Sequence, residues 1–258
     1  MLIETPRRLH LGLIDPSASL GRRFGSLSVA LEHGYRVKLS SHSGFHVVAN
    51  EEDKRTINFV VDKMNLKFAT GFDYLIEVER AIPRHVGLGS TTQLTLAVGL
   101  GIARLNDLRV EIEEIASLLG RGKNSGAGTY VFKYGGFIVD GGIKDGSFPP
   151  LILRKEFPKD WVFLLIIPSV KRGFDEKKEK PIMENVRGKE NAAEKISHRI
   201  LLGLLPALEE KDIAKFGKHL SEIQALVGRH FEEYQGGKFR KDLELIMEFL
   251  RKNTYGYG

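Results

Sequence analysis

The sequence contains no cysteine. Disulfide bonds, metal sites with thiolate ligands and a cysteine nucleophile are therefore excluded. The sequence also lacks any apolar run near the ~20 residues that a membrane-spanning helix requires. Its first residues, Met1 to Pro6, are too short and too acidic for a signal peptide. We therefore expect a cytoplasmic protein with no membrane partner.

Long runs of purely basic residues are absent as well. The chain carries 39 Lys and Arg residues against 33 Asp and Glu residues, which gives a formal net charge of +6. The basic residues are spread out, and the clearest run, Lys177 to Lys180, includes a glutamate. This pattern favours a solvated surface over a nucleic-acid site, and the positive balance suits an anionic small-molecule substrate.

Apolar patterning predicts strands mainly in the first part of the chain and helices in the last part. The predicted strands are residues 36–40 and 73–80, a glycine-interrupted strand within residues 131–140, and a central strand at 161–167. The predicted helices are residues 91–105, 111–119, 191–205, 212–226 and 239–250, and residues 171–189 are predicted to form a loop. This order indicates an α+β architecture, with one domain at residues 1–155 and a second at residues 156–258.

A glycine-rich turn joins a predicted strand to a predicted helix at Pro83–Thr92. Its glycines allow a tight turn and bring backbone N–H groups close to a ligand. The start of the helix adds unpaired N–H donors and the positive end of a dipole. The predicted phosphate-binding residues are Gly87, Leu88, Gly89, Ser90, Thr91 and Thr92. Ser90 is also a candidate ligand for Mg²⁺; the alternative is that these hydroxyl groups only cap the helix.

The full string resembles the second motif of the GHMP kinases (galactokinase, homoserine, mevalonate and phosphomevalonate kinases), which reads Pro-X-X-X-Gly-Leu-Gly-Ser-Ser-Ala. Residues 5–12 resemble the N-terminal substrate motif of that family, and residues 125–136 resemble the stretch that often carries its catalytic aspartate. The resemblance implies the GHMP-kinase fold. That fold has an N-terminal domain that resembles domain 2 of ribosomal protein S5, and a ferredoxin-like α/β C-terminal domain.

One departure from the kinase pattern concerns the catalytic aspartate. In the kinases the segment that corresponds to residues 125–136 reads Ser-Gly-X-Asp and ends eight residues later in Gly-Gly. Gly135 and Gly136 keep that spacing here, but Gly128 occupies the aspartate position. A glycine cannot accept the proton of a substrate hydroxyl group. This weakens a kinase interpretation without removing it, since some kinases of the family lack the aspartate too.

The motifs resemble one branch of the superfamily in particular, the archaeal β-ribofuranosylaminobenzene 5′-phosphate synthases. That branch reads Thr-Pro-X-Arg-Leu-His-X-Gly-Leu-Ile-Asp near its start and then Gly-Arg, as this chain does from Thr5 to Asp15 and at Gly21-Arg22. Further matches are Arg121-Gly122, Ser125-Gly126, Gly128 and the run from Gly135 to Gly142.

This resemblance implies a transferase that uses phosphoribosyl pyrophosphate, a phosphorylated small-molecule donor, in place of ATP. The acceptor would be an aromatic acid, 4-aminobenzoate, and the reaction would release carbon dioxide and pyrophosphate in tetrahydromethanopterin biosynthesis. Pyrophosphate leaves the anomeric carbon, the ring carbon that bears the carboxylate attacks, and loss of carbon dioxide restores aromaticity. No strong base is needed, so Gly128 is compatible with this chemistry. The site must instead stabilise a highly charged donor, with help from Mg²⁺.

The resemblance gives Asp15 and Arg22 catalytic roles. Asp15 has three alternative roles: to bind the metal, to stabilise the developing cation, or to bond the acceptor. From spacing alone, Asp15 followed by Pro16 and Ser17 is also an ordinary turn. Arg22 is a candidate for bidentate contacts with phosphate.

The same resemblance indicates substrate binding by Arg8, His10, Ser125 and Gly126. The alternatives are ordinary ones. His10 lies among apolar residues and suits a core histidine, and Ser125 suits a turn cap.

Three functions stay open from the sequence: the transferase, a small-molecule kinase that uses ATP and Mg²⁺, and a degenerate phosphate-binding protein without catalysis. Family members carry a third glycine-rich motif near the C-terminus, and this chain ends at Gly258 without one. We therefore expect a shortened second domain with an exposed sheet edge, and as a consequence a homodimer or reduced stability.

Overall fold

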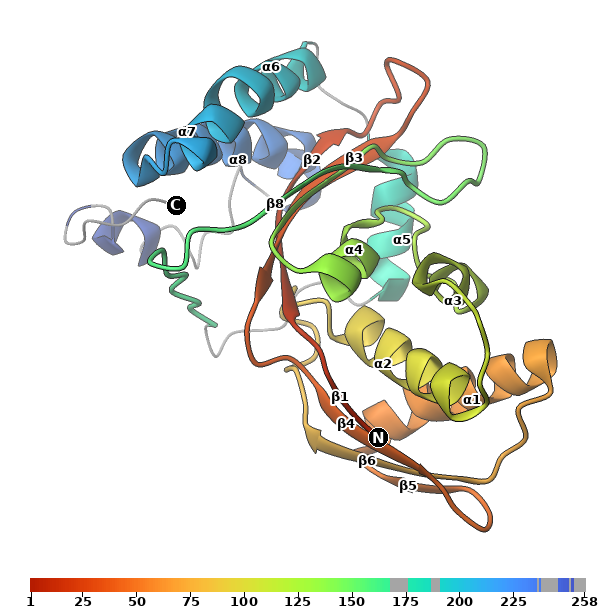
Figure 1. Ribbon diagram of the computed structural model, residues 1–258. Helices are drawn as coiled ribbons and strands as arrows, with labels where there is room; N and C mark the ends of the chain where they lie inside the picture. Colours follow the sequence, from red (N-terminus) through yellow and green to blue (C-terminus); the bar gives the residue numbers. More distant parts are fainter. Residues whose placement is uncertain (168–175, 187–190, 236, 238–245, 251, 253–258) are drawn as a thin grey trace.

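The structure is a computed structural model that describes residues 1–167, 176–186, 191–235, 237, 246–250 and 252. The described residues form two four-stranded sheets that are covered by helices, as Figure 1 shows. The predicted α+β class is confirmed by this arrangement.

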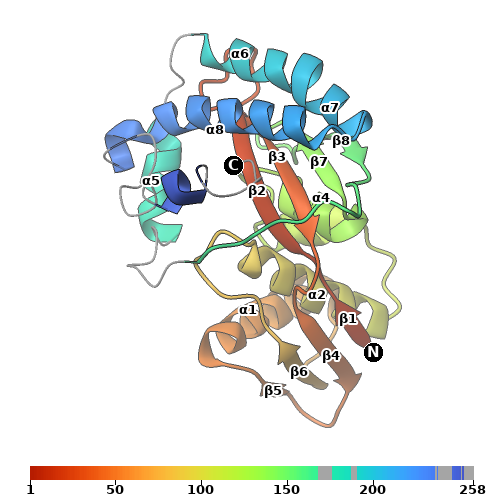
Figure 2. The same cartoon turned by 90° about the vertical axis from the view of Figure 1, so that its left-hand side faces the viewer.

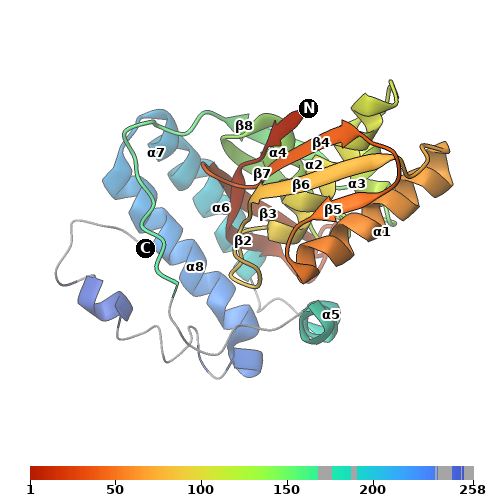
Figure 3. The ribbon, with the colours of Figure 1, turned by 90° about the horizontal axis from the view of Figure 1, so that it is seen from below.

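The first sheet has the strand order β1-β4-β6-β5 and contains the N-terminus. Its strands are β1 (Leu2–Glu4), β4 (Arg36–Ser41), β6 (Tyr74–Arg80) and β5 (His46–Val48), and only the β5–β6 pair is parallel. Figure 3 shows the helices α1 (Glu51–Phe68) and α2 (Ser90–Leu105) on one face of this sheet, with α3 (Ile112–Leu118) beside them. The largest hydrophobic cluster fills the space between this sheet and these helices.

The second sheet has the order β2-β3-β7-β8, and all of its strand pairs are antiparallel. Its strands are β2 (Arg7–Asp15), β3 (Phe24–Leu31), β7 (Phe137–Asp140) and β8 (Leu151–Lys155). The C-terminal helices lie across one face of it (Figure 2). They are α6 (Ala192–Arg199), the π-helical turn η1 (Ile200–Leu204), α7 (Leu205–Glu209) and α8 (Ile213–Gln235).

The two faces of the second sheet differ in polarity, because alternate residues of a strand point to opposite faces. Leu27 and Val29 of β3 pack with the C-terminal helices. Ser26 and Ser28 therefore lie on the opposite face, which α4 (Ala127–Tyr134) covers. The helix α5 (Glu176–Asn185) packs near the end of β2 through a small cluster that contains Met183 and Val186. A buried polar surface thus lies between the second sheet and α4.

Most of the predicted elements are confirmed, two predictions were wrong, and one strand is shorter than its predicted range. Residues 161–167 do not form a central strand: they pair with no described strand, and Val162 is 89% exposed. The strand predicted within residues 131–140 is β7, but it begins only at Phe137. Residues up to Tyr134 belong to α4, and Gly135 and Gly136 turn the chain between the two with positive φ. The described part of the predicted loop at 171–189 is mostly helical, because it contains α5; residues 171–175 and 187–189 lie outside the described residues.

Two other predictions lie at the limits of the described chain. The helix predicted at 239–250 falls mostly outside the described residues. Whether residues 156–258 form a separate domain stays a prediction. The described part of that segment packs its helices on strands of the first part through a shared hydrophobic cluster.

Candidate active site

The glycine-rich turn connects β6 to α2 and is open to solvent on its outer side. Gly87 has a φ of +77° and Gly89 a φ of +73°, which are values that favour glycine. A Cβ atom at Gly87 would meet nothing within 4 Å, whereas one at Gly89 would lie 3.0 Å from the Cβ atom of Arg8. Gly87 therefore leaves room for a ligand, and Gly89 allows β2 to pack closely against the turn.

The start of α2 keeps the unpaired donors that an anion site requires. Its N-cap residue, Gly89, provides no side-chain cap. The first helical bond runs from the N–H of Gln93 to the carbonyl oxygen of Gly89, at 3.0 Å. The backbone N–H groups of Ser90, Thr91 and Thr92 precede that bond, so the helix itself does not satisfy them. This backbone fits the predicted phosphate cradle.

A buried ion pair, which the sequence analysis missed, anchors the turn to α1. The guanidinium of Arg84 donates to the fully buried carboxylate of Asp53, and also to the hydroxyl groups of Thr56 (3.0 Å) and Thr91 (3.3 Å). Burial raises the pKa of Tyr35, whose hydroxyl group donates to Asp53 at 2.9 Å. Arg84 thus holds both ends of the turn in place. In the sequence, Arg84 precedes Gly87 by three residues and Asp53 lies in the helix before β6. Without the fold, this spacing does not indicate that the two residues form an ion pair.

A cavity of about 630 Å³ opens beside the start of α2. Thr92 and Ser125 both line this cavity, so it adjoins the predicted phosphate cradle. Its other lining residues are Arg23, Phe24, Gly120, Arg121, Gly122, Lys123, Asn124, Ile143, Met183 and Glu184. Three basic side chains against one acidic side chain make it attractive to anions.

The start of α4 lies directly against the start of α2. Gln93 donates to the carbonyl oxygen of Gly128 at 2.9 Å, and a Cβ atom at Gly128 would lie 3.1 Å from Cγ2 of Thr92. The predicted substrate residues Ser125 and Gly126 come just before α4, and Gly126 is its N-cap. The structure therefore brings together the two segments that the sequence singled out separately, and Gly128, at the position of the missing kinase aspartate, faces the first turn of α2.

Arg8 and His10 lie on β2, which runs past the turn. The N–H group of Arg8 donates to the carbonyl oxygen of Leu88 at 3.0 Å, so Arg8 is placed at the cradle. The N–H group of Gly12 donates to Nδ1 of His10 at 3.0 Å, across a bulge in the β2–β3 pairing. Burial, with a smaller effect of Arg8, lowers the pKa of His10 to about 3. His10 is therefore neutral near pH 7 and holds the bulge.

Asp15 and Arg22 do not line the cavity, and their side chains bond the backbone of two loops. The carboxylate of Asp15 accepts bonds from the N–H groups of Ser17 and Ser19, both at 2.7 Å, and from the hydroxyl group of Ser19 at 2.6 Å. Arg22 donates to the carbonyl oxygens of Gly141 (2.8 Å) and Gly142 (3.0 Å). Their catalytic roles stay predictions, and the contacts that the structure describes stabilise the surrounding loops.

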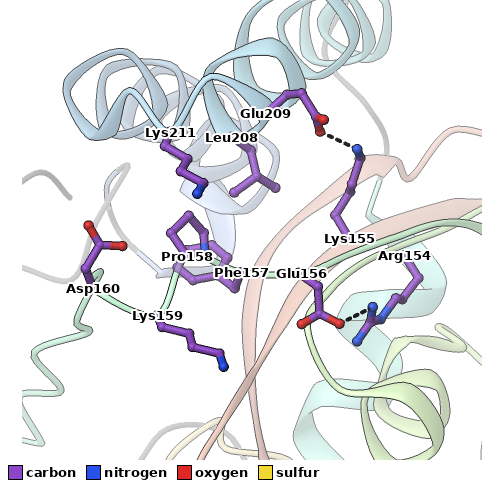
Figure 4. Close-up of a pocket in the computed structure, with 10 residues that line it drawn as sticks. All are labelled: Arg154, Lys155, Glu156, Phe157, Pro158, Lys159, Asp160, Leu208, Glu209 and Lys211. Carbon is purple, nitrogen blue, oxygen red and sulfur yellow. Dashed lines mark hydrogen bonds and ion pairs between the residues drawn. The ribbon is translucent and has the colours of Figure 1, made fainter.

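A second, larger cavity of about 940 Å³ lies between the end of β8 and α7 (Figure 4). Two ion pairs lie in its wall: Lys155 bonds Glu209, and Arg154 lies 2.5 Å from Glu156. The glycine-rich turn does not line it. Because this cavity is lined by residues 154–160, 208–209 and 211 and not by the start of α2, it is the weaker candidate for a phosphate-bearing substrate.

Two other features are absent from the described residues. Within the described residues, no three His, Asp or Glu side chains are grouped in a way that suits a metal ion. No helix in the described part of the chain is both long and apolar enough to cross a membrane.

Known proteins with similar sequences and structures identify the fold family of this protein. The family "GHMP kinases N terminal domain" matches residues 54–136, which include the glycine-rich turn and α4. The phosphomevalonate kinase of Streptococcus pneumoniae shares this fold: the TM-score is 0.64, over 89% of this chain and 79% of that chain, at 12% identity. The protein thus has the GHMP-kinase fold, as the sequence predicted.

Two curated relatives narrow the class. The β-ribofuranosylphenol 5′-phosphate synthase of Archaeoglobus fulgidus is 34% identical over 93% of this chain and 80% of its own length. The protein of the same name from Methanocaldococcus jannaschii is 31% identical over 99% of this chain and 85% of its own length. The chain therefore belongs to the β-ribofuranosylphenol 5′-phosphate synthase family, a group of synthases within the GHMP kinase superfamily.

Proposed function

We propose that this protein transfers a 5-phosphoribosyl group from phosphoribosyl pyrophosphate to the ring of a para-substituted benzoate, with release of pyrophosphate and carbon dioxide. The similarity to synthases along nearly the whole chain carries this proposal. The cradle at the start of α2 and the basic cavity beside it support it, because the donor carries a pyrophosphate group and a phosphate group.

The acceptor is the point at which the relatives differ from the sequence-based expectation. Their name contains a phenol, whereas the motifs suggested an aminobenzene product. Decarboxylation of 4-hydroxybenzoate leaves a phenol ring, as decarboxylation of 4-aminobenzoate leaves an aminobenzene ring. Both para groups donate electrons to the ring carbon that attacks. We therefore propose 4-hydroxybenzoate as the acceptor, and 4-aminobenzoate as the competing substrate that a test must include.

The proposed reaction balances without a protein base. The bond between the anomeric carbon and the pyrophosphate oxygen breaks, and pyrophosphate leaves with the electron pair. The ring carbon that bears the carboxylate forms the new carbon–carbon bond. The bond to the carboxylate then breaks, and its electrons restore the aromatic ring as carbon dioxide leaves. Gly128, which occupies the position of the kinase aspartate, is compatible with this sequence of steps.

The protein contributes electrostatic stabilisation of the leaving group. In this proposal the N–H groups of residues 87–92 bind the pyrophosphate as its charge grows, and this contribution is greatest in the transition state. Lys123 and Arg121 line the adjoining cavity, where they attract the donor's other phosphate. The anchor at Arg84 keeps the turn in its binding conformation before the donor arrives.

Mg²⁺ is part of the proposal, as a companion of the donor. Magnesium is commonly held by substrate phosphates, water and few protein groups. The absence of a carboxylate cluster among the described residues fits such binding. Ser90, at the first position of α2, is the proposed protein ligand, because its hydroxyl group makes no hydrogen bond with the rest of the described chain.

Incubation of the protein with Mg²⁺, phosphoribosyl pyrophosphate and either benzoate tests this proposal. Equal amounts of pyrophosphate and carbon dioxide are expected, with faster release from 4-hydroxybenzoate. A parallel reaction with ATP and candidate alcohols tests the kinase alternative through formation of ADP. Formation of ADP without carbon dioxide would reject the transferase, and no product in either reaction would favour the phosphate-binding protein without catalysis.

A further inference from the structure

A network of three side chains lies at the wall of the cavity, and the reaction steps above do not use it. Two of its members, Ser26 and Asp140, are fully buried, and the third, Ser125, is half-buried. Asp140, the last residue of β7, is fully buried. Its Oδ2 atom accepts hydrogen bonds from the hydroxyl groups of Ser26 (2.5 Å) and Ser125 (2.8 Å). Its Oδ1 atom accepts from the N–H group of Gly142 at 3.0 Å. Ser125, which lines the cavity, is therefore joined to a buried carboxylate.

The hydroxyl groups of this network have too few protons to fill all of its short oxygen–oxygen contacts. The hydroxyl oxygens of Ser26 and Ser125 lie 2.7 Å apart, so three oxygen–oxygen contacts share two hydroxyl protons. An ionised carboxylate only accepts hydrogen bonds. The N–H group of Ala127 also donates to the Ser125 oxygen, at 3.1 Å. Ser125 consequently has no proton to offer a ligand and presents an acceptor to the cavity.

The type of group that Ser125 can bind follows from this arrangement. Phosphate oxygens accept hydrogen bonds at neutral pH, so Ser125 is badly suited to them. A hydroxyl group of a ligand, in contrast, can donate to the Ser125 oxygen. The same face of β3 carries a second buried hydroxyl group, that of Ser28, which bonds no residue of the described chain.

We propose that Ser125, positioned by Asp140 and Ser26, binds a hydroxyl group of the ribosyl ring of the donor. This inference rests on the proposed function. The ribose is attached directly to the pyrophosphate, and the two adjoining helix starts place Thr92 and Ser125 on one cavity. A ribose whose pyrophosphate lies at the start of α2 is therefore adjacent to Ser125. Asp140 is a positioning residue in this scheme, since Ser125 alone contacts the ligand.

Calorimetric titration with two probes separates hydroxyl recognition from anion recognition. Ribose 5-phosphate carries ring hydroxyl groups, and inorganic pyrophosphate carries none; both are titrated in the presence of Mg²⁺. In Ser125→Ala we expect the affinity for ribose 5-phosphate to fall about tenfold, as for one lost hydrogen bond. The affinity for pyrophosphate should change less than about twofold. Ser125→Thr should restore the binding of ribose 5-phosphate, and Asp140→Asn should resemble Ser125→Ala.

Ser117→Ala is the control, because its hydroxyl group bonds only the carbonyl oxygen of Glu113 on the exposed side of α3. Should Asp140→Asn fail to fold, the Ser125 variants decide the question alone. A Ser125→Ala variant that loses both probes equally, or neither, contradicts this inference while the proposed function stands. A wild-type protein that binds neither probe contradicts the proposed function and this inference together.

Discussion

Arg84 provides the sharpest test of how the glycine-rich turn is held. Replacing it by methionine keeps a side chain of similar length but leaves the carboxylate of Asp53 buried without its cation. Asp53 is fully buried, and the side chain of Arg84 is 12% exposed. Removal of one partner of a buried ion pair costs about 3–5 kcal/mol. We expect Arg84→Met to lower the free energy of unfolding by that amount and to weaken the binding of pyrophosphate.

The control is an ion pair of similar geometry at the surface. The guanidinium of Arg36 lies 2.7 Å from the carboxylate of Glu79, and both side chains are 42% exposed. Arg36→Met should therefore cost less than about 1 kcal/mol. Urea unfolding followed by circular dichroism measures both variants. In the double variant Asp53→Asn, Arg84→Met, the loss should be smaller than the sum of the single losses, because no buried charge is left unpaired. Equal losses in Arg84→Met and Arg36→Met would refute the anchor.

Three further predictions concern the backbone around the site. His10→Asn keeps an acceptor for the N–H group of Gly12. As the pH is lowered from 6.5 to 4, the free energy of unfolding of this variant should decrease less steeply than that of the wild type. In this pH range the histidine of the unfolded wild-type chain binds a proton, whereas His10 in the folded protein, with its pKa of about 3, does not. This difference lowers the free energy of unfolding of the wild type by at most about 1.4 kcal/mol for each pH unit. Urea titration at several pH values checks this slope, and identical slopes would contradict it. Gly89→Ala should lower thermal stability more than Gly146→Ala. The two glycines have φ angles of +73° and +72°, but only the first meets a neighbour within 4 Å; a calorimetric scan compares them, and equal losses would contradict the close approach of β2. Gly128→Asp should raise the KM of phosphoribosyl pyrophosphate about tenfold without producing ADP from ATP, because the new carboxylate would face the phosphate cradle. Gly128→Asn is the uncharged control, and ATP-dependent phosphorylation by Gly128→Asp would overturn this assignment of the position.

The elements that depend on local patterning were predictable from the sequence. Tyr74–Arg80 and Ser90–Leu105 were found within one residue of their bounds, because alternation and helical spacing are strong in both. The segment 161–167 was misjudged for a reason that local pattern cannot reveal. A continuous apolar run is typical of a central strand, but whether neighbours cover both faces depends on tertiary structure. In the described chain, alternate residues of this run are exposed.

The candidate site was predictable as separate motifs, and its connections were not. The glycine-rich turn and residues 125–128 were recognisable because each has a local pattern of glycine and hydroxyl residues. Their contact at Thr92 and Gly128 results from the packing of α2 against α4. The buried carboxylates that organise the site, Asp53 and Asp140, lie far from the turn in sequence. Only the fold shows that each is bonded to a residue of the site.

The central claim is that backbone N–H groups at the start of α2 bind the donor's pyrophosphate. Titration of ¹⁵N-labelled protein with inorganic pyrophosphate and Mg²⁺, followed by amide chemical shifts, tests it directly. The largest shifts should occur at residues 87–92, with smaller ones at 121–126 across the cavity. Shifts confined to other parts of the chain, with residues 87–92 unchanged at saturation, would contradict the claim.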